Sequence, residues 1–309
     1  MKEALYWSTA IDGAVQCNLC PHRCSIANGA KGICGVRFNK EGKLYSPGYG
    51  AISAIALDPI EKKPLYCFHP RSKILSIGGF GCNLRCPFCQ NYEISMDRSA
   101  IAETCGSDKC VSGNPGNGTT GNRIGRRGRK ITPEDIVAAA SDTIPKGNIG
   151  VAYTYNEPLI NFEFLKDCAT LINAAGLNNV IVTNGFIDLE PLEDILPFID
   201  AMNIDLKSFS DDFYKKAGGR LEPVLKTIEA SVKQCHIEVT TLVIPGENED
   251  DVKEIAKWLA SIDPDIPLHL SRFFPNYLYS DRAPTTRESI LKLQETASMH
   301  LNRVYSGNM

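Results

Sequence analysis

Long hydrophobic runs are absent from this sequence of 309 residues. No apolar stretch approaches the roughly 20 residues that a helix needs to cross a bilayer, which argues against an integral membrane protein. The first residues, MKEALYWSTAIDGAV, also lack the charged and then apolar build of a secretory signal. We therefore expect a cytoplasmic protein that does not associate with a membrane.

An excess of charge of one sign is also missing. The formal net charge is only −3, from 33 lysine and arginine residues against 36 aspartate and glutamate residues. This balance gives no overall attraction to nucleic acid or to an anionic membrane. An apolar content of 43% over this length is enough to bury the core of one large domain with a small appendage.

Cysteine, by contrast, is abundant, with 12 residues in the chain. Six of them lie in two short segments, CNLCPHRC at residues 17–24 and CNLRCPFC at residues 82–89. A disulfide framework would spread its cysteines more widely. In a reducing compartment, clustered thiols usually hold a metal, so both segments are candidate metal sites.

Short apolar runs alternate with helical patterns from Lys73 onward. In EDDVKEIAKWLA, for example, Val252, Ile255, Ala256 and Leu259 form one apolar stripe. Six apolar runs predict strands, at residues 73–79, 148–154, 179–183, 201–206, 237–244 and 266–271. Alternation of such strands with helices indicates a parallel sheet covered by helices. We therefore predict an α/β fold with a partial (β/α)6 TIM-type barrel, although a doubly wound open sheet fits the same pattern.

Two helix starts carry recognisable capping residues. Thr132 precedes Pro133, which suits the first position of a helix. Thr285 and Glu288 have the spacing of a capping box, which predicts the start of the last helix.

The chain divides into three predicted parts. Residues 1–72 form a small Cys-rich N-terminal module, residues 73–303 form the barrel, and residues 304–309 form a tail. Residues 104–130 are rich in Gly, Asn and Arg with few apolar side chains, so we expect a flexible insertion in the barrel. Its RRGRK end fits a solvated loop better than a nucleic-acid contact, and its Cys105 and Cys110 are a weaker candidate thiol pair.

Cys82, Cys86 and Cys89 are the strongest candidate metal ligands. Their spacing would place them on one face of a helix, where buried free cysteines are common. Pro87 argues against a helix, and the preceding glycines argue against a helix start, so we predict a loop directly after a strand. Three thiolates on a four-iron cluster leave one iron without a protein ligand, which lets a small molecule bind the metal.

The first cysteine cluster offers four thiolates instead of three. Cys17, Cys20, Cys24 and Cys34 follow the spacing C-x2-C-x3-C-x9-C. Four thiolates close a zinc site or a second iron–sulfur cluster with no open position, and sequence does not separate the two because both metals favour sulfur. Unligated buried cysteines are the alternative.

The segment GCNLRCPFCQNYEIS resembles the signature of radical S-adenosylmethionine (SAM) enzymes, CxxxCxxC with an aromatic residue before the third cysteine. The resemblance implies a 4Fe–4S cluster that donates an electron to the sulfonium of SAM, whose amino and carboxylate groups chelate the open iron. The products would be methionine and a 5′-deoxyadenosyl radical, which takes a hydrogen atom from a substrate. The protein would supply ligation, orientation and a dry pocket.

The resemblance also implies a SAM-binding set at the carboxyl ends of the strands, where a barrel builds its site. Glu157 with Pro158 is similar to the end of the family's Gly-Gly-Glu-Pro motif, whose polar end holds the SAM ammonium. Asp205 and Lys207 match the Asp-Leu-Lys of pyruvate formate-lyase activating enzymes, where these groups contact the methionine end. The full set is Phe88, Asn156, Glu157, Thr183, Asn184, Asp205, Lys207 and His269.

Four further residues of this set rest on the same resemblance. Thr183 and Asn184 are similar to the Thr-Asn-Gly of the same activating enzymes. Phe88 matches the aromatic residue beside the adenine, and His269, expected at the end of the sixth strand, resembles the histidine near the SAM ribose. Alone, such pairs are more often turn and cap residues, and a lone histidine is more often a core residue.

Further motifs extend the resemblance over nearly the whole chain. DPIEKKPLY, TTLVIPGEN, PLHLSRFFP and VYSGN, in this order, look like the AmmeMemoRadiSam-system radical SAM enzymes, a subgroup similar to pyruvate formate-lyase activating enzyme. The resemblance implies an electron donor of the flavodoxin or ferredoxin type. The substrate is an unidentified protein, RNA or small molecule, and activation of a glycyl-radical enzyme is one option. A non-catalytic zinc or iron–sulfur binding module is the alternative, which the strand-end residues disfavour.

Overall fold

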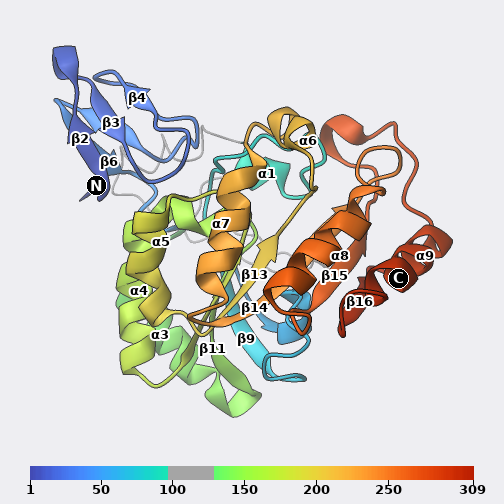
Figure 1. Ribbon diagram of the computed structural model, residues 1–309. Coiled ribbons are helices and arrows are strands. Elements are labelled where there is room, and N and C mark those ends of the chain that lie inside the picture. Colours follow the sequence, from blue (N-terminus) through green and yellow to red (C-terminus); the bar gives the residue numbers. More distant parts are fainter. Residues whose placement is uncertain (97–128) are drawn as a thin grey trace.

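The computed structural model describes residues 1–96 and 129–309, and its centre is an eight-stranded sheet (Figure 1). The strand order is β16-β15-β14-β13-β12-β11-β9-β8. The strands are β8 (Ala54–Pro59), β9 (Lys73–Gly78), β11 (Asn148–Tyr153), β12 (Asn178–Thr183), β13 (Ala201–Asp205), β14 (His236–Val243), β15 (Leu268–Arg272) and β16 (Val304–Gly307). The six predicted strands correspond to β9 and β11 to β15, and these six are confirmed.

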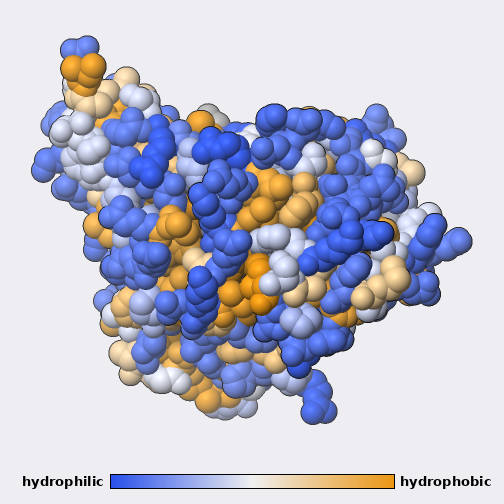
Figure 2. Space-filling model, viewed as in Figure 1, coloured by the Kyte–Doolittle hydropathy of each residue, from blue (hydrophilic) through white to orange (hydrophobic). Residues whose placement is uncertain are grey.

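Helices follow the strands and cover one face of the sheet (Figure 1). They are α3 (Pro133–Asp142), α4 (Phe162–Ala174), α5 (Leu189–Ile195), α6 (Asp211–Lys216), α7 (Leu221–Ser231), α8 (Asp251–Ile262) and α9 (Arg287–Ser298). The predicted apolar stripe of α8, which runs along one side of the helix between Val252 and Leu259, is buried. Figure 2 shows hydrophilic residues along much of the outer surface of the helices. All neighbouring strands from β9 to β16 pair in parallel. The predicted partial α/β barrel is therefore confirmed.

The sheet extends past both ends of the predicted barrel segment. β8, from the predicted N-terminal module, pairs antiparallel with β9, with Asp58 opposite Ile74. β16, from the predicted tail, pairs in parallel with β15. Each added strand covers a sheet edge that would otherwise present unpaired backbone groups.

The two faces of the sheet bury different clusters. On the helix-covered face, strand residues such as Leu75 and Val151 pack with residues of the helices. On the opposite face, Ile74 and Ala152 pack with Ile60, which belongs to the 3-10 helix η2 (Ile60–Lys62) that follows β8. Successive side chains alternate between the faces of a strand, so the segment after β8 fills the interior of the open barrel.

One predicted helix start is confirmed and the other is displaced. Thr132 caps α3 in a capping box whose second member is Asp135. The prediction of Thr285 and Glu288 for the last helix is wrong, because α9 is capped by Thr286, whose hydroxyl accepts from the backbone N–H of Ser289. The Thr285 hydroxyl is buried and donates to the carbonyl of Val243 at 2.6 Å, so it ties the chain to β14 instead.

The N-terminal residues form two small antiparallel sheets. One has the order β2-β3-β4 and the other β1-β6-β5. Their strands are β1 (Lys2–Glu3), β2 (Trp7–Thr9), β3 (Val15–Cys17), β4 (Ser25–Ile26), β5 (Phe38–Lys40) and β6 (Lys43–Ser46). A further short strand, β7 (Ala51–Ile52), pairs with β10 (Arg129–Lys130).

The predicted thiol pair Cys105 and Cys110 lies outside the described residues. Within the described part of the chain, none of the helices has the length and apolar character needed to cross a membrane.

Candidate active site

The loop with the three thiols begins directly after β9, as the sequence predicts. It contains no helix until the short helix α1 (Tyr92–Ser95). Gly81 adopts a φ of +85°, in the left-handed region that favours glycine. An added Cβ there would lie 2.5 Å from the carbonyl oxygen of Cys34, so the loop packs against the backbone of the N-terminal residues.

The three thiols have surroundings that suit an iron–sulfur cluster. The sulfur of Cys82 accepts hydrogen bonds from the backbone N–H of Leu84 at 3.3 Å and from the side chain of Asn184 at 3.6 Å. Burial raises the pKa of all three thiols, to about 11 for Cys86. Buried thiols of this kind ionise on gaining a cationic partner such as iron, which binds the thiolate.

The thiols must still move together to bind a cluster. In residues 1–96 and 129–309, no three His, Cys, Asp or Glu side chains are gathered closely enough to hold a metal ion. Cys82, Cys86 and Cys89 nevertheless lie near enough for their charges to interact. The donor set therefore fits a 4Fe–4S cluster, with three thiolates on one loop and hydrogen-bond donors to sulfur.

Glu157 connects the ends of β11 and β12 beside this loop. Its carboxylate accepts from the Thr183 hydroxyl at 2.8 Å and from the backbone N–H of Asn184 at 2.8 Å. It also accepts from the N–H of Leu159 at 3.0 Å, at the start of the 3-10 helix η4 (Pro158–Asn161). Burial raises the pKa of Glu157 to about 7, although these donors favour the charged form.

The raised pKa of Glu157 predicts how stability depends on pH. Because the folded-state pKa lies above the ordinary value of 4.5, the folded protein binds the proton more tightly than the unfolded chain. The contribution of Glu157 to stability should therefore be greatest at low pH and fall by up to about 3 kcal/mol as pH rises through the window from about 5 to 7.

This pH dependence is measured by urea unfolding of the wild type and of Glu157→Gln at pH 5 and pH 8, without SAM. Glutamine does not titrate, so the difference between the two proteins isolates this carboxyl group. We expect the wild type to exceed the variant in free energy of unfolding by more at pH 5 than at pH 8. If this difference stays constant, or grows toward pH 8, the pKa of Glu157 is not raised in the folded protein.

Asn156 and Tyr155 hold the start of the thiol loop. The Asn156 side chain accepts from the N–H of Gly79 at 2.8 Å and donates to the carbonyl of Gly81 at 3.0 Å. Tyr155 has a φ of +72°, unusual for a residue other than glycine, and its hydroxyl donates to Asp58 at 2.7 Å. Tyr155 thus adopts a left-handed backbone at the position where the family's Gly-Gly-Glu-Pro motif has its first glycine. Asn156, the next residue, contacts the backbone of the thiol loop.

Asp205 is the last residue of β13, Lys207 lies two residues further along, and their side chains form an ion pair of 2.8 Å. Burial alone would lower the pKa of Lys207, but the charges of Asp205 and Cys86 raise it above its ordinary value. Asp205 keeps 36% of its side chain exposed, so the pair opens onto solvent beside the thiol loop. This cation and carboxylate match the two charged groups of an amino acid.

Phe88 and His269 are both buried against other side chains. Phe88 is buried and packs against Phe213, with ring centroids 5.6 Å apart. The prediction that His269 ends its strand is wrong, because His269 is the second residue of β15. Its ring bonds the buried carboxylate of Glu238 at 2.6 Å, which holds it within the barrel. The proposed contacts of these two residues with SAM stay predictions.

The structure also assembles a polar cluster that the sequence analysis missed. Glu238, on β14, bonds both His236 and His269 and accepts from the backbone N–H groups of Tyr66 and Cys67. Burial disfavours its charged form, but these donors dominate and lower the pKa of Glu238 to about 2. A charged glutamate within the predicted buried strand IEVTTLVI was the available signal, because buried carboxylates require such partners.

An open α/β barrel with a three-thiol loop at the carboxyl end of a parallel strand defines an enzyme with an iron–sulfur cofactor. Residues 76–259 match the Radical SAM superfamily. The uncharacterized protein MJ0808 of Methanocaldococcus jannaschii is 37% identical over 314 residues, which cover 100% of this chain and 86% of that protein. The chain therefore belongs to the radical SAM superfamily, whose cofactors are a 4Fe–4S cluster and SAM.

Two further similarities are more distant. The pyruvate formate-lyase-activating enzyme of Clostridium pasteurianum is 26% identical over 193 residues, 59% of this chain and 69% of that enzyme. The crystal structure of QueE from Escherichia coli has a TM-score of 0.52 and 13% identity, and covers 84% of this chain and 94% of that one. At this identity the second similarity concerns the fold alone, whereas the first agrees with the predicted subgroup.

Proposed function

We propose that this protein cleaves SAM reductively and uses the resulting 5′-deoxyadenosyl radical to abstract a hydrogen atom from a substrate. Cys82, Cys86 and Cys89 would hold the cluster, which would supply the electron and one iron without a protein ligand for the amino and carboxylate groups of SAM to chelate. The protein binds and orients SAM at the carboxyl ends of β11 to β13 and excludes water there.

One hydrogen-bond network carries this proposal, because it joins the thiol loop to the strand ends. The Asn184 side chain donates to the sulfur of Cys82 and to the side-chain oxygen of Asn83, the latter at 2.9 Å. Its backbone N–H donates to Glu157, which also accepts from Thr183. A cluster ligand and the proposed SAM pocket are therefore fixed relative to each other, as an electron transfer between them requires.

Each strand-end group has a distinct proposed role. Lys207 binds the SAM carboxylate, which suits its half-buried ion pair, and Asp205 keeps the lysine charged and oriented. Glu157 is a positioning residue, since its oxygens already accept three hydrogen bonds, and its charge favours the nearby SAM ammonium. Phe88 contacts the adenine and His269 the ribose, as the family resemblance implies.

The proposed substrate follows from the activating-enzyme relatives. We propose activation of a glycyl-radical enzyme, in which the abstracted hydrogen comes from a glycine of the partner protein, with a flavodoxin or ferredoxin as electron donor and a cytoplasmic location. The probe is a glycyl-radical enzyme, pyruvate formate-lyase, incubated with the reduced protein and SAM. A glycyl radical signal in electron paramagnetic resonance supports the proposal. Its absence, with SAM cleavage intact, favours another protein, RNA or a small molecule.

Replacement of Lys207 by methionine tests the SAM pocket. We expect the KM for SAM to rise roughly 10- to 100-fold, because a charge-assisted hydrogen bond is lost. The reconstituted protein is reduced with dithionite in the presence of SAM, and 5′-deoxyadenosine is quantified by chromatography. Lys215→Met, which removes an exposed lysine on the neighbouring helix α6, is the matched control.

Three outcomes are informative in this assay. An unchanged KM in Lys207→Met excludes the proposed carboxylate contact. A rise of similar size in Lys215→Met assigns the effect to overall charge instead. If the wild type forms no 5′-deoxyadenosine while its cluster is intact, the alternative of a non-catalytic zinc or iron–sulfur binding module replaces the enzyme.

A further inference from the structure

We propose that the N-terminal residues hold a second metal centre, bound by the thiolates of Cys17, Cys20, Cys24 and Cys34, and that the guanidinium of Arg37 is its buried counter-charge. This centre is separate from the SAM-binding cluster, and the proposed function does not require it. Zinc and a 4Fe–4S cluster share the chemistry that the site offers, which is four sulfur ligands with no open position.

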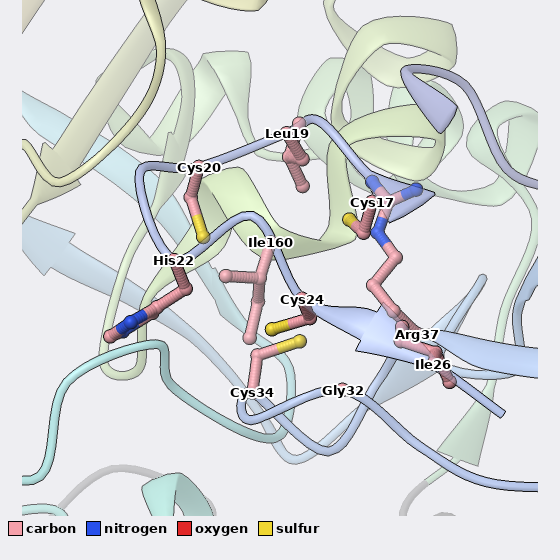
Figure 3. A pocket seen from close by; sticks show the side chains of 10 residues that line it. All are labelled: Cys17, Leu19, Cys20, His22, Cys24, Ile26, Gly32, Cys34, Arg37 and Ile160. Carbon is pink, nitrogen blue, oxygen red and sulfur yellow. The ribbon is translucent and has the colours of Figure 1, made fainter. Parts of the chain in front are cut away.

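The four cysteines line one pocket (Figure 3). Cys17 ends β3 and donates its backbone N–H to the carbonyl of Cys24, at 2.9 Å, so two of them are fixed by strand pairing. Figure 3 shows the sulfurs of Cys20, Cys24 and Cys34 directed into the space between their loops, with the sulfur of Cys17 on the far side of it. The rest of the lining is largely apolar, which excludes water from a bound metal.

Backbone N–H groups lie near three of these sulfurs. The N–H groups of Leu19, His22 and Val36, each two positions beyond its cysteine, favour the thiolate forms of Cys17, Cys20 and Cys34 and so oppose the rise in pKa that burial causes. The sulfur of Cys82 in the radical SAM loop accepts from Leu84 with the same spacing. Donors of this kind stabilise thiolates, although the four sulfurs must still move together to bind a metal, because no three His, Cys, Asp or Glu side chains of the described residues are close enough to hold one.

Arg37 supplies an independent observation. Its side chain is 1% exposed, and one terminal nitrogen donates to Glu163 of α4 at 2.8 Å. Its Nε and other terminal nitrogen are buried and have no hydrogen-bond partner within the described residues. Unpaired N–H groups on a buried cation are costly, so a nearby acceptor is expected. In Figure 3 the guanidinium lies beside Cys17, at the edge of the pocket.

Metal binding resolves this imbalance. Four thiolates around Zn²⁺, or around an oxidised 4Fe–4S cluster, leave a double negative charge on the centre. The free N–H groups of Arg37 then gain sulfur acceptors, while the ion pair of Arg37 with Glu163 at 2.8 Å is kept. Without a metal, the Nε and one terminal nitrogen of Arg37 stay buried without a hydrogen-bond partner among the described residues.

The proposed centre adjoins the radical SAM loop. The ring of His22 bonds the carbonyl of Asn83 at 2.7 Å, and Arg85 donates to the carbonyl of Ile33. These contacts place the loop of Cys34 against the loop of Cys82. A zinc ion would therefore brace the catalytic loop, whereas an iron–sulfur cluster would be positioned to pass electrons toward it.

The decisive experiment removes the first site and leaves the second intact. In the full-length variant Cys82→Ala, Cys86→Ala and Cys89→Ala, purified without oxygen and reconstituted with iron and sulfide, we expect either about one zinc or about four iron atoms per chain. Further substitution of Cys20 and Cys24 by alanine should remove that metal, while Cys235→Ala added to the triple variant should leave it in place.

Elemental analysis, acid-labile sulfide and X-ray absorption at the metal edge identify the centre. A shell of sulfur at about 2.3 Å around zinc indicates a structural zinc ion that stabilises the catalytic loop. Iron together with acid-labile sulfide indicates an iron–sulfur cluster that transfers electrons. A triple variant that is folded by circular dichroism but holds neither metal overturns the proposal. Metal that remains after loss of Cys20 and Cys24 also overturns it.

Arg37 is tested separately in the same triple-variant background. Arg37→Met combined with Glu163→Gln avoids leaving a buried charge unpaired, and we expect metal affinity, measured against a chelator, to fall roughly 10- to 100-fold. The sulfur coordination should be retained, because the ligands are unchanged. An affinity equal to that of the parent excludes the counter-charge role of Arg37.

Discussion

A Cys86→Ala variant is expected to lose the 4Fe–4S cluster at Cys82 to Cys89 and, with it, all detectable formation of 5′-deoxyadenosine. Cys86 is the middle ligand of the loop and 6% exposed. Two thiolates leave two irons of a cluster without protein ligands, and no cluster means no electron for the sulfonium. The loss of activity should be complete rather than partial.

The fold itself should survive this substitution. Replacing one buried sulfur by hydrogen leaves a cavity of about a methyl group, which costs on the order of 1 kcal/mol. Circular dichroism and urea unfolding check the fold, while absorbance and electron paramagnetic resonance of the reduced, reconstituted protein follow the cluster. Cys235→Ala, a cysteine at the opposite end of β14 from the thiol loop, is the control and should retain both signals.

Two results would contradict this assignment. Retention of the cluster signal in Cys86→Ala means that other side chains ligate the iron. Retention of 5′-deoxyadenosine formation without the cluster removes the radical mechanism. A residual iron or zinc signal from the proposed second centre is distinguishable, since it should persist unchanged in Cys86→Ala and should not respond to SAM.

Local sequence patterns were enough to predict the fold and the thiol loop. Buried parallel strands read as continuous apolar runs, and Pro87 with its flanking glycines excludes a helix, so both features depend on neighbours in sequence. The placement of Glu157, Asn184 and Lys207 followed because the carboxyl ends of parallel strands meet at one edge of a sheet.

Such local patterns could not predict contacts between segments that lie far apart in the sequence. β8 is a short run whose antiparallel partner β9 is set by tertiary pairing, and its sequence alone does not select the sheet edge it covers. Thr285 and Thr286 are chemically identical, and contacts with the distant residues Val243 and Phe273 decide that Thr285 is the one that leaves the cap. His269 and Glu238 likewise meet across strands that are 31 residues apart.

The pairing of Arg37 with Glu163 illustrates the same limit for the second site. These residues are 126 positions apart, and the sequence spacing of the four cysteines contains no sign of the buried cation beside them. Four thiols predict a metal site in isolation. The structure adds the charge balance, because it places an incompletely paired guanidinium at the same pocket.

Gly81 connects the two thiol clusters, and Gly81→Ala is expected to destabilise the protein by about 2–5 kcal/mol. A Cβ at this position would lie 2.5 Å from the carbonyl oxygen of Cys34 and 2.9 Å from a methyl group of Val36. The peptide cannot easily move away, because its N–H donates to Ile94 at 2.8 Å and its carbonyl accepts from Asn156 at 3.0 Å. The loop should shift as a unit, which displaces Cys82 and lowers iron incorporation.

Gly147→Ala separates this steric clash from backbone strain. Gly147 has a φ of +89°, close to the +85° of Gly81, but an added Cβ there would meet nothing within 4 Å. The free energy of unfolding of the control should therefore fall only by the strain of an alanine in the left-handed region, about 1–2 kcal/mol. The control should keep its iron. Urea unfolding and iron analysis compare the two variants. Equal losses in both would mean that the contact between the thiol loop and Cys34 does not constrain the cluster, because only Gly81 faces that carbonyl.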